Sequence, residues 1–207
     1  MSGVLGTALL VPHPAFARTL KLVALGDSLT AGYGLGPGEA FPDVLQKALR
    51  AKGYDVEIAN AGVSGDTAAA GAERLDWSVP DGTDGVIVEL GANDALRGIP
   101  PEQTRAALDR ILTRLGERKI PVLLAGMLAP RNLGPDYIAA FDGMYRKLAD
   151  LHGAVFYPFF LEGVAGDKSL NLADGIHPTA AGVSRIVERM LPTVETFIKR
   201  LERRPPA

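Results

Sequence analysis

Residues 21–28 read Lys-Leu-Val-Ala-Leu-Gly-Asp-Ser, a short apolar run that stops in a polar turn. A run of this length is typical of a buried strand, and the glycine marks the point where the chain turns. Two later runs, Val56–Asn60 and Val86–Leu90, are also followed closely by glycine-containing polar turns, and Glu89 is the one charged residue within the second of them. Near-continuous apolar strands favour a parallel sheet that is covered on both faces.

Helical stretches separate these runs. Their apolar residues recur at helical spacing, and glycine follows two of the stretches, where a C-cap is expected. We predict helices over Phe41–Lys52, Thr67–Leu75, Pro101–Glu117, Pro135–His152 and Pro178–Leu201, and further strands over Val122–Gly126 and Val155–Tyr157. Strands that alternate with helices predict an α/β fold with a five-stranded parallel sheet and helices on both faces.

The chain has 207 residues, of which 47% are apolar and 22% charged, as expected of one globular domain. We assign this domain to residues 18–202 and a solvated tail to residues 203–207. The formal net charge of −2 leaves no broad basic field, so nucleic acid is not an expected partner. The sequence contains no cysteine, which excludes disulfides, thiolate nucleophiles and cysteine-ligated zinc.

Residues 1–17 have a different character. Residues 3–11 are small and apolar, and Ala15-Phe16-Ala17 supplies small residues before Arg18, as at the end of a secretory signal peptide. No Lys or Arg precedes the apolar run, so the alternative of a frayed tail stays open. The run is too short for a membrane span of ~20 residues. The signal interpretation predicts a periplasmic or secreted protein, and the alternative a cytoplasmic one.

One serine and one histidine have the surroundings that nucleophilic catalysis needs. Ser28 lies at the end of the first strand, and His177 lies in Asp174-Gly175-Ile176-His177-Pro178. A serine becomes a nucleophile beside a general base, and the base needs a third group to fix its tautomer. The spacing of three lets the Asp174 carboxylate reach one imidazole nitrogen and leaves the other for Ser28. Pro178 restricts the backbone before it and suits the first turn of a helix.

Donors for a developing oxyanion are also available at strand ends. They are the backbone N–H groups of Ser28 and Gly65 and the side-chain amide of Asn93. Because ligands bind beyond the carboxyl ends of parallel strands, these turns should meet at one edge of the sheet. We interpret Asp27 and Asp94 as organisers of the local backbone.

Four blocks of the sequence occur in one order along the chain. They are Gly26-Asp27-Ser28-Leu29-Thr30, Gly62-Val63-Ser64-Gly65-Asp66-Thr67, Gly91-Ala92-Asn93-Asp94 and Asp174-Gly175-Ile176-His177-Pro178. Together they resemble the SGNH (GDSL-type) hydrolase family, and the resemblance covers nearly all of residues 20–200. Residues 90–98 and 130–137 are similar to the bacterial arylesterase and multifunctional thioesterase/lysophospholipase branch.

The resemblance implies a three-layer α/β/α, flavodoxin-like fold. It implies a serine hydrolase that cleaves carboxylic esters through an acyl-enzyme intermediate, with thioesters and lysophospholipids as further candidate substrates. The implied triad is Ser28, Asp174 and His177, and the implied oxyanion donors are the Ser28 N–H, the Gly65 N–H and Asn93. Neither a metal nor a cofactor is required, and the expected partner of a monomeric enzyme is a small ester or thioester.

The branch also suggests that residues 127–137 form a mobile wall of the acyl pocket. Leu96, Pro130 and Asn132 are therefore candidate substrate-binding residues, whereas we expect Arg97 to lie in solvent.

Other interpretations are weighed beside this one. Ser28 could be a helix N-cap only, and Asp174 with His177 a capping arrangement. A metal-dependent phosphoesterase could gather its ligands from Asp27, Asp66, Asp94, Asp174 and His177. A binding module could use the glycine-rich residues 26–38, although these lack the Gly-Lys-Ser/Thr ending of a phosphate loop.

Overall fold

A computed structural model describes residues 18–203, so the predicted signal segment at 1–17 and residues 204–207 of the tail lie outside the described residues. Five strands form one parallel sheet in the order β2-β1-β3-β4-β5. This arrangement confirms the predicted sheet. The strands are β1 (Leu20–Gly26), β2 (Val56–Gly62), β3 (Gly85–Glu89), β4 (Val122–Ala125) and β5 (Val155–Tyr157).

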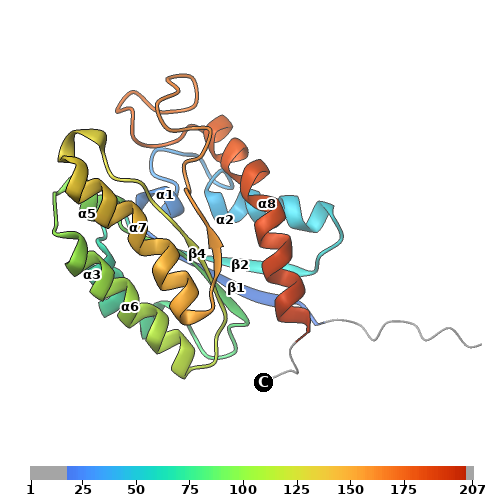
Figure 1. Cartoon of the computed structure of the whole chain (residues 1–207). Coiled ribbons are helices and arrows are strands. Elements are labelled where there is room, and N and C mark those ends of the chain that lie inside the picture. The colour runs from blue at the N-terminus through green and yellow to red at the C-terminus, as the bar shows by residue number, and fades with distance from the viewer. Residues whose placement is uncertain (1–17, 204–207) are drawn as a thin grey trace, which may run out of the picture.

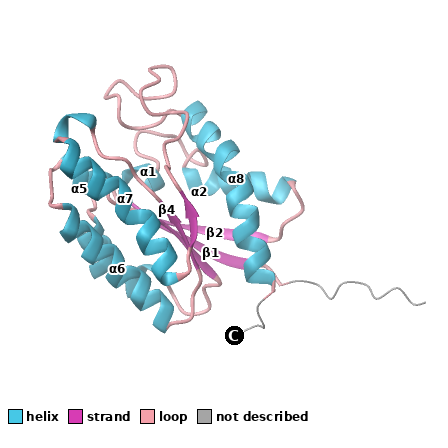
Figure 2. Cartoon of the chain, viewed as in Figure 1, coloured by secondary structure: helices cyan, strands magenta, loops and turns pink. Residues whose placement is uncertain are grey.

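Helices cover both faces of this sheet, which confirms the three-layer α/β/α fold (Figures 1 and 2). Helices α2 and α8 pack together over one face, and α3, α6 and α7 pack over the other. The helices are α1 (Ser28–Ala31), α2 (Phe41–Ala51), α3 (Ala68–Glu73), α4 (Leu75–Ser78), α5 (Ala92–Leu96), α6 (Pro101–Glu117), α7 (Pro135–His152) and α8 (Ala180–Glu202), with a 3₁₀ turn η1 (Arg131–Leu133).

The register of the strands aligns the turns that carry chemistry. Gly26 at the end of β1 lies opposite Gly62 of β2 and Glu89 of β3. The chain therefore leaves these three strands at one level, and the polar turns that follow meet at the carboxyl edge. Below this edge the central strands β1 and β3 are largely buried, since Leu25 and Ile87 are fully inaccessible to solvent, whereas β2 lies at the side of the sheet and exposes half of its residues or nearly so.

Two predicted helices differ from the observed ones. The stretch Thr67–Leu75 is two short helices, because the chain breaks at Arg74 between α3 and α4. The last helix begins at Ala180, where the Thr179 side chain accepts the Gly182 N–H. The prediction that Pro178 is the first helical residue is therefore wrong. Pro178 instead forms an isolated antiparallel bridge with Asn171.

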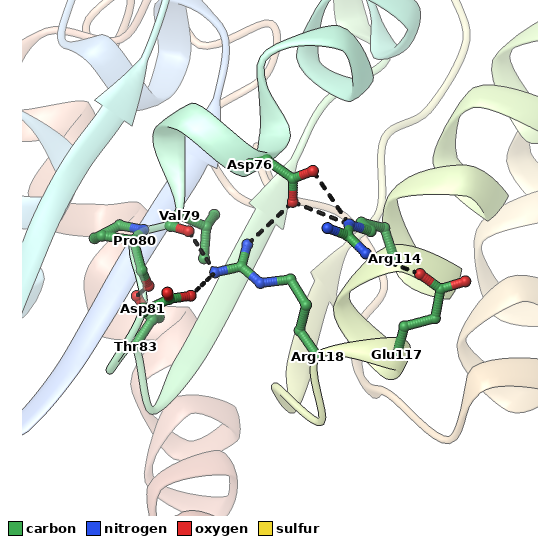
Figure 3. A network of polar contacts seen from close by, with 8 residues as sticks. All are labelled: Asp76, Val79, Pro80, Asp81, Thr83, Arg114, Glu117 and Arg118. Carbon is green, nitrogen blue, oxygen red and sulfur yellow. Dashed lines mark hydrogen bonds and ion pairs between the residues drawn. The ribbon is translucent and has the colours of Figure 1, made fainter.

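A polar network joins α4 to the end of α6 (Figure 3). The Asp76 carboxylate accepts hydrogen bonds from both Arg114 and Arg118. Arg118 also donates to the Val79 carbonyl at 2.6 Å, and its side chain is only 14% exposed. The Arg114–Asp76 pair is exposed to solvent and therefore contributes little to stability. The largely buried Arg118 is thus the member that fixes the loop after α4 against α6.

Candidate active site

Ser28 is the first residue of α1, directly after β1, and is only 8% exposed. The N-cap of this short helix is Asp27, whose Oδ1 accepts the Leu29 N–H at 2.9 Å. Ser28 is therefore not the N-cap, which removes the simplest structural explanation for a serine at this position. Gly32 ends the helix in the left-handed conformation at φ 84°, a conformation that glycine adopts without strain.

His177 lies between a serine and a carboxylate. Its Nε2 is 2.9 Å from the Ser28 Oγ, and its Nδ1 is 2.7 Å from Asp174 Oδ2. The other oxygen, Asp174 Oδ1, accepts the backbone N–H groups of Ile176 and His177. These bonds, led by that of the His177 N–H, lower the pKa of Asp174 to about 2. The carboxylate is thus charged at neutral pH and fixes the imidazole from one side.

The turn that carries Asp174 and His177 is closed on itself. Gly175 at its centre has φ 70°, and the Leu172 N–H donates to the His177 carbonyl at 2.7 Å. The bridge between Asn171 and Pro178 lies just outside this bond. The predicted glycine-containing turn is therefore present and holds its two polar side chains in a fixed relation.

Gly65 occupies the tight turn after β2. The Asp66 N–H donates to the Val63 carbonyl, and Gly65 has φ 86°. The Gly65 carbonyl accepts a hydrogen bond from Arg97 Nη2 at 2.7 Å. The prediction that Arg97 does no more than lie in solvent is therefore wrong: its side chain is exposed, but it holds this turn. Nothing in its sequence position indicated that contact, which depends on how α5 lies beside the turn.

Asn93 links the turns after β1 and β2. Its Nδ2 donates to Asp27 Oδ2 at 3.0 Å and to the Asp66 carbonyl at 2.9 Å. Both amide hydrogens thus have partners in the resting site. The neighbouring Asp94 accepts the N–H that opens α3 and a hydroxyl of α6, which confirms its predicted structural role.

Two buried carboxyl groups lie behind Ser28. Burial raises the pKa of Asp27 to about 6, against the opposing effect of its bonds with Leu29 and Asn93. Burial also raises the pKa of Glu89 well above its ordinary value, and the charge of nearby Asp27 adds to this. Glu89 Oε2 accepts the Thr30 hydroxyl at 2.8 Å, while Oε1 has no partner among residues 18–203. Glu89 is a site residue that sequence reasoning missed, although its charge within an apolar strand was the available signal.

These pKa shifts predict how stability depends on pH. The folded protein binds both protons more tightly than the unfolded chain does. The contribution of these two groups to the free energy of unfolding should therefore be complete below about pH 4 and be lost as pH rises through 6, by up to about 1.4 kcal/mol per pH unit for each group. Glu89→Gln keeps an acceptor for Thr30 and removes one titration. Urea unfolding between pH 5 and 8 should show that the free energy of unfolding of this variant depends less steeply on pH. An equally steep dependence would contradict the raised pKa of Glu89.

A pocket of about 340 Å³ opens beside Ser28 and His177. Its lining includes the predicted residues Leu96 and Pro130, but Asn132 is exposed on η1 and does not line it. One wall comes from Met127 and Leu128 after β4, within the segment predicted to form the acyl pocket. The remaining apolar lining residues are Leu29, Ala92, Ala95, Leu161, Ala165 and Ile176. The pocket thus offers an apolar surface next to a hydrogen-bonded serine.

The acidic residues considered as metal ligands do not form a cluster that could bind a metal ion. Across the described part of the chain, no group of three or more His, Cys, Asp or Glu side chains is arranged to hold a metal ion. Asp27, Asp66 and Asp174 are each engaged with hydrogen-bond donors instead. The metal-dependent alternative therefore has no ligand set within residues 18–203.

The fold, the pocket and the comparisons with known proteins define the chain as a carboxylic ester hydrolase. Within this class it belongs to the GDSL-like Lipase/Acylhydrolase family, whose sequence profile matches residues 24–185.

Three similar proteins illustrate the relationship. Esterase TesA of Pseudomonas aeruginosa is 39% identical over 199 residues, which cover 96% of this chain and 98% of that protein. Thioesterase 1/protease 1/lysophospholipase L1 of Escherichia coli K12 is 35% identical, over 92% of this chain and 89% of that protein. The crystal structure of AlinE4, an SGNH-hydrolase family esterase, is 47% identical with a TM-score of 0.74, over 88% and 98% of the two chains.

Proposed function

We propose that this enzyme hydrolyses acyl esters and thioesters through a triad of Ser28, His177 and Asp174 and a covalent acyl-enzyme. The observation that carries the proposal is the chain of two hydrogen bonds, from Ser28 Oγ to His177 Nε2 at 2.9 Å and from Nδ1 to Asp174 at 2.7 Å. This is the arrangement in which a base activates a hydroxyl and a carboxylate orients the base.

In the first half of the reaction, Ser28 Oγ attacks the acyl carbon and His177 Nε2 takes its proton. The imidazolium then gives this proton to the departing alcohol, phenol or thiol, and the acyl group stays on Ser28. In the second half, His177 takes a proton from water as the water oxygen attacks the acyl-enzyme. The proton returns to Ser28 Oγ as the acid leaves.

The N–H groups of Ser28 and Gly65 and the Asn93 amide are the proposed donors to the tetrahedral oxyanion. Arg97 supports this role because it bonds the carbonyl of Gly65 and so restrains the turn. Asn93 already bonds Asp27 and Asp66, so one of its amide hydrogens must be shared with the oxyanion. Such prearranged donors require little reorganisation as charge develops.

The apolar pocket favours an acyl group as the part of the substrate that is bound there. The names of the relatives, which include esterase and thioesterase/lysophospholipase, support simple esters, thioesters and lysophospholipids as substrates. A chain-length series of p-nitrophenyl esters and acyl thioesters would rank them. All the proposed catalytic groups belong to one chain, so we propose that a monomer is active.

The test of the proposed nucleophile is covalent labelling. An organophosphonate should add once per chain, and peptide mass spectrometry should find the adduct on Ser28. His177→Ala should label far more slowly, whereas His152→Ala, which alters a second histidine–aspartate pair outside the site, should label at the normal rate. Absence of labelling in the unmodified enzyme would contradict the proposal.

Export from the cytoplasm is a further part of the proposal, and it rests on the sequence of residues 1–17 alone. No helix within residues 18–203 is long and apolar enough to cross a membrane. N-terminal sequencing of the mature protein should begin at Arg18, and a start at Met1 would contradict export.

A further inference from the structure

The aromatic ring of Tyr33 lies against the imidazole of His177. The two ring centroids are 4.4 Å apart, and the ring planes are inclined by 36°. Tyr33 follows Gly32, whose left-handed backbone turns the chain back after α1. The Tyr33 N–H donates to the Ser28 carbonyl at 3.1 Å. The short helix that carries Ser28 therefore also fixes the backbone of the residue that covers His177.

The folded core does not account for this placement. Tyr33 is 52% exposed and is not among the side chains that pack against the hydrophobic core. Within residues 18–203, no hydrogen bond to the Tyr33 hydroxyl accompanies the ring contact. Tyr33 also lies outside the lining of the acyl pocket. Its one distinctive contact is thus with the face of the imidazole.

The bonds of His177 restrain the imidazole at its edges only. Nδ1 and Nε2 are held in the plane of the ring by Asp174 and Ser28. A ring against the face limits tilting out of this plane. The face of an aromatic ring also attracts a cation, so it favours the imidazolium that forms when His177 accepts the proton of Ser28.

Three titratable groups surround this imidazole. Asp174 bonds Nδ1, the buried Asp27 carboxyl interacts with its charge, and the Tyr33 phenol covers its face. The two carboxylates come from the turn at 174–177 and from the start of α1. Tyr33 is the only one of the three that can be replaced without removing a group that we assign to the catalytic site or its backbone.

We propose that Tyr33 is a positioning residue for the reaction, which holds the plane of the His177 imidazole and favours its protonated form. The inference rests on the proposed role of His177 as the general base. It explains the position of the Tyr33 ring, which packs neither against the core nor in the acyl pocket.

The test compares Tyr33→Leu with Tyr33→Phe, which keeps the ring. Tyr33→Leu should lower kcat about two- to fivefold, with little change in KM, for aryl and alkyl esters of the same acid alike. Its imidazole should be harder to protonate, so the acidic limb of the kcat/KM profile should move down by about 0.4–0.7 pH unit. Tyr33→Phe should match the unmodified enzyme in both measurements.

Two outcomes would overturn the proposal. One is a Tyr33→Leu variant with an unchanged kcat and acidic limb. The other is a loss that appears only in KM and only with aryl esters, which would make Tyr33 a leaving-group contact. If Tyr33→Leu did not show a cooperative unfolding transition, Tyr33→Trp would be used in its place. The face of the tryptophan ring attracts a cation more strongly, so the acidic limb of the kcat/KM profile should move to higher pH. Phosphonate labelling would separate this result from a failure of the proposed function. If His177 were not the general base, the labelling rate of Ser28 would be the same with and without His177.

Discussion

Replacing Ser28 or His177 by alanine is expected to lower kcat by about 10⁴–10⁶, and the double variant is expected to be little slower than either single one. The two side chains share one hydrogen bond, and the proposed mechanism uses both of them in one step, so loss of either should remove the same function. Steady-state and single-turnover rates with one p-nitrophenyl ester would measure the three losses. Losses that multiply in the double variant would contradict a shared step.

The matched control is His152→Ala. His152 also pairs with a carboxylate, since its Nε2 is 2.6 Å from Asp109 Oδ1, but it ends α7 away from the serine. Its removal should leave kcat unchanged. Equal unfolding midpoints for the Ser28 and His177 variants would show that their losses arise in the site.

The second large effect is expected at Gly62, the last residue of β2. A methyl group here would overlap the Ala31 backbone nitrogen and lie 2.7 Å from its Cα. The backbone of α1 cannot turn aside as a flexible side chain could. We therefore expect Gly62→Ala to lower the free energy of unfolding by about 2–4 kcal/mol and to reduce activity by displacing the helix that begins with Ser28.

Gly143→Ala in α7 is the control for this substitution. A methyl group at Gly143 meets nothing within 4 Å, and helical alanine is favoured over glycine by roughly 0.5–1 kcal/mol. This variant should be slightly more stable than the unmodified protein and fully active. Urea unfolding of the pair would measure both effects, and equal stability of the two variants would refute the close approach of β2 to α1.

The layers and the strand ends could be predicted because they depend on local patterns. Short apolar runs, helical periodicity and glycine turns have the same meaning in the sequence and in the fold. The break at Arg74 could not be predicted, because it accompanies bonds from the guanidinium to Asp66 and to the carbonyl of Gly26, which is distant in sequence. No spacing in the sequence encodes such a contact.

The same limit applies to the site. Ser28, Asp174 and His177 could be proposed together because a serine, an aspartate and a histidine lie in recognisable turns, and the sheet-edge rule brings those turns together. The contacts of Tyr33 and Arg97 were missed because each of these residues touches a group that is distant in sequence, His177 and Gly65 respectively. Their chemistry is visible only when the turns are seen side by side.

Two of the walls of the pocket beside Ser28 differ in how freely they can evolve. Leu161, Ala165 and Asn171 belong to the irregular segment between β5 and α8, which continues directly into the turn of Asp174 and His177. The Asn171 amide ties this segment together through the carbonyls of Val164 and Asp167. Remodelling this wall would disturb the base as well as the substrate, whereas residues 127–130 lie on a separate segment. New substrate preferences should therefore arise first at residues 127–130, where selection for specificity does not compete with selection for rate.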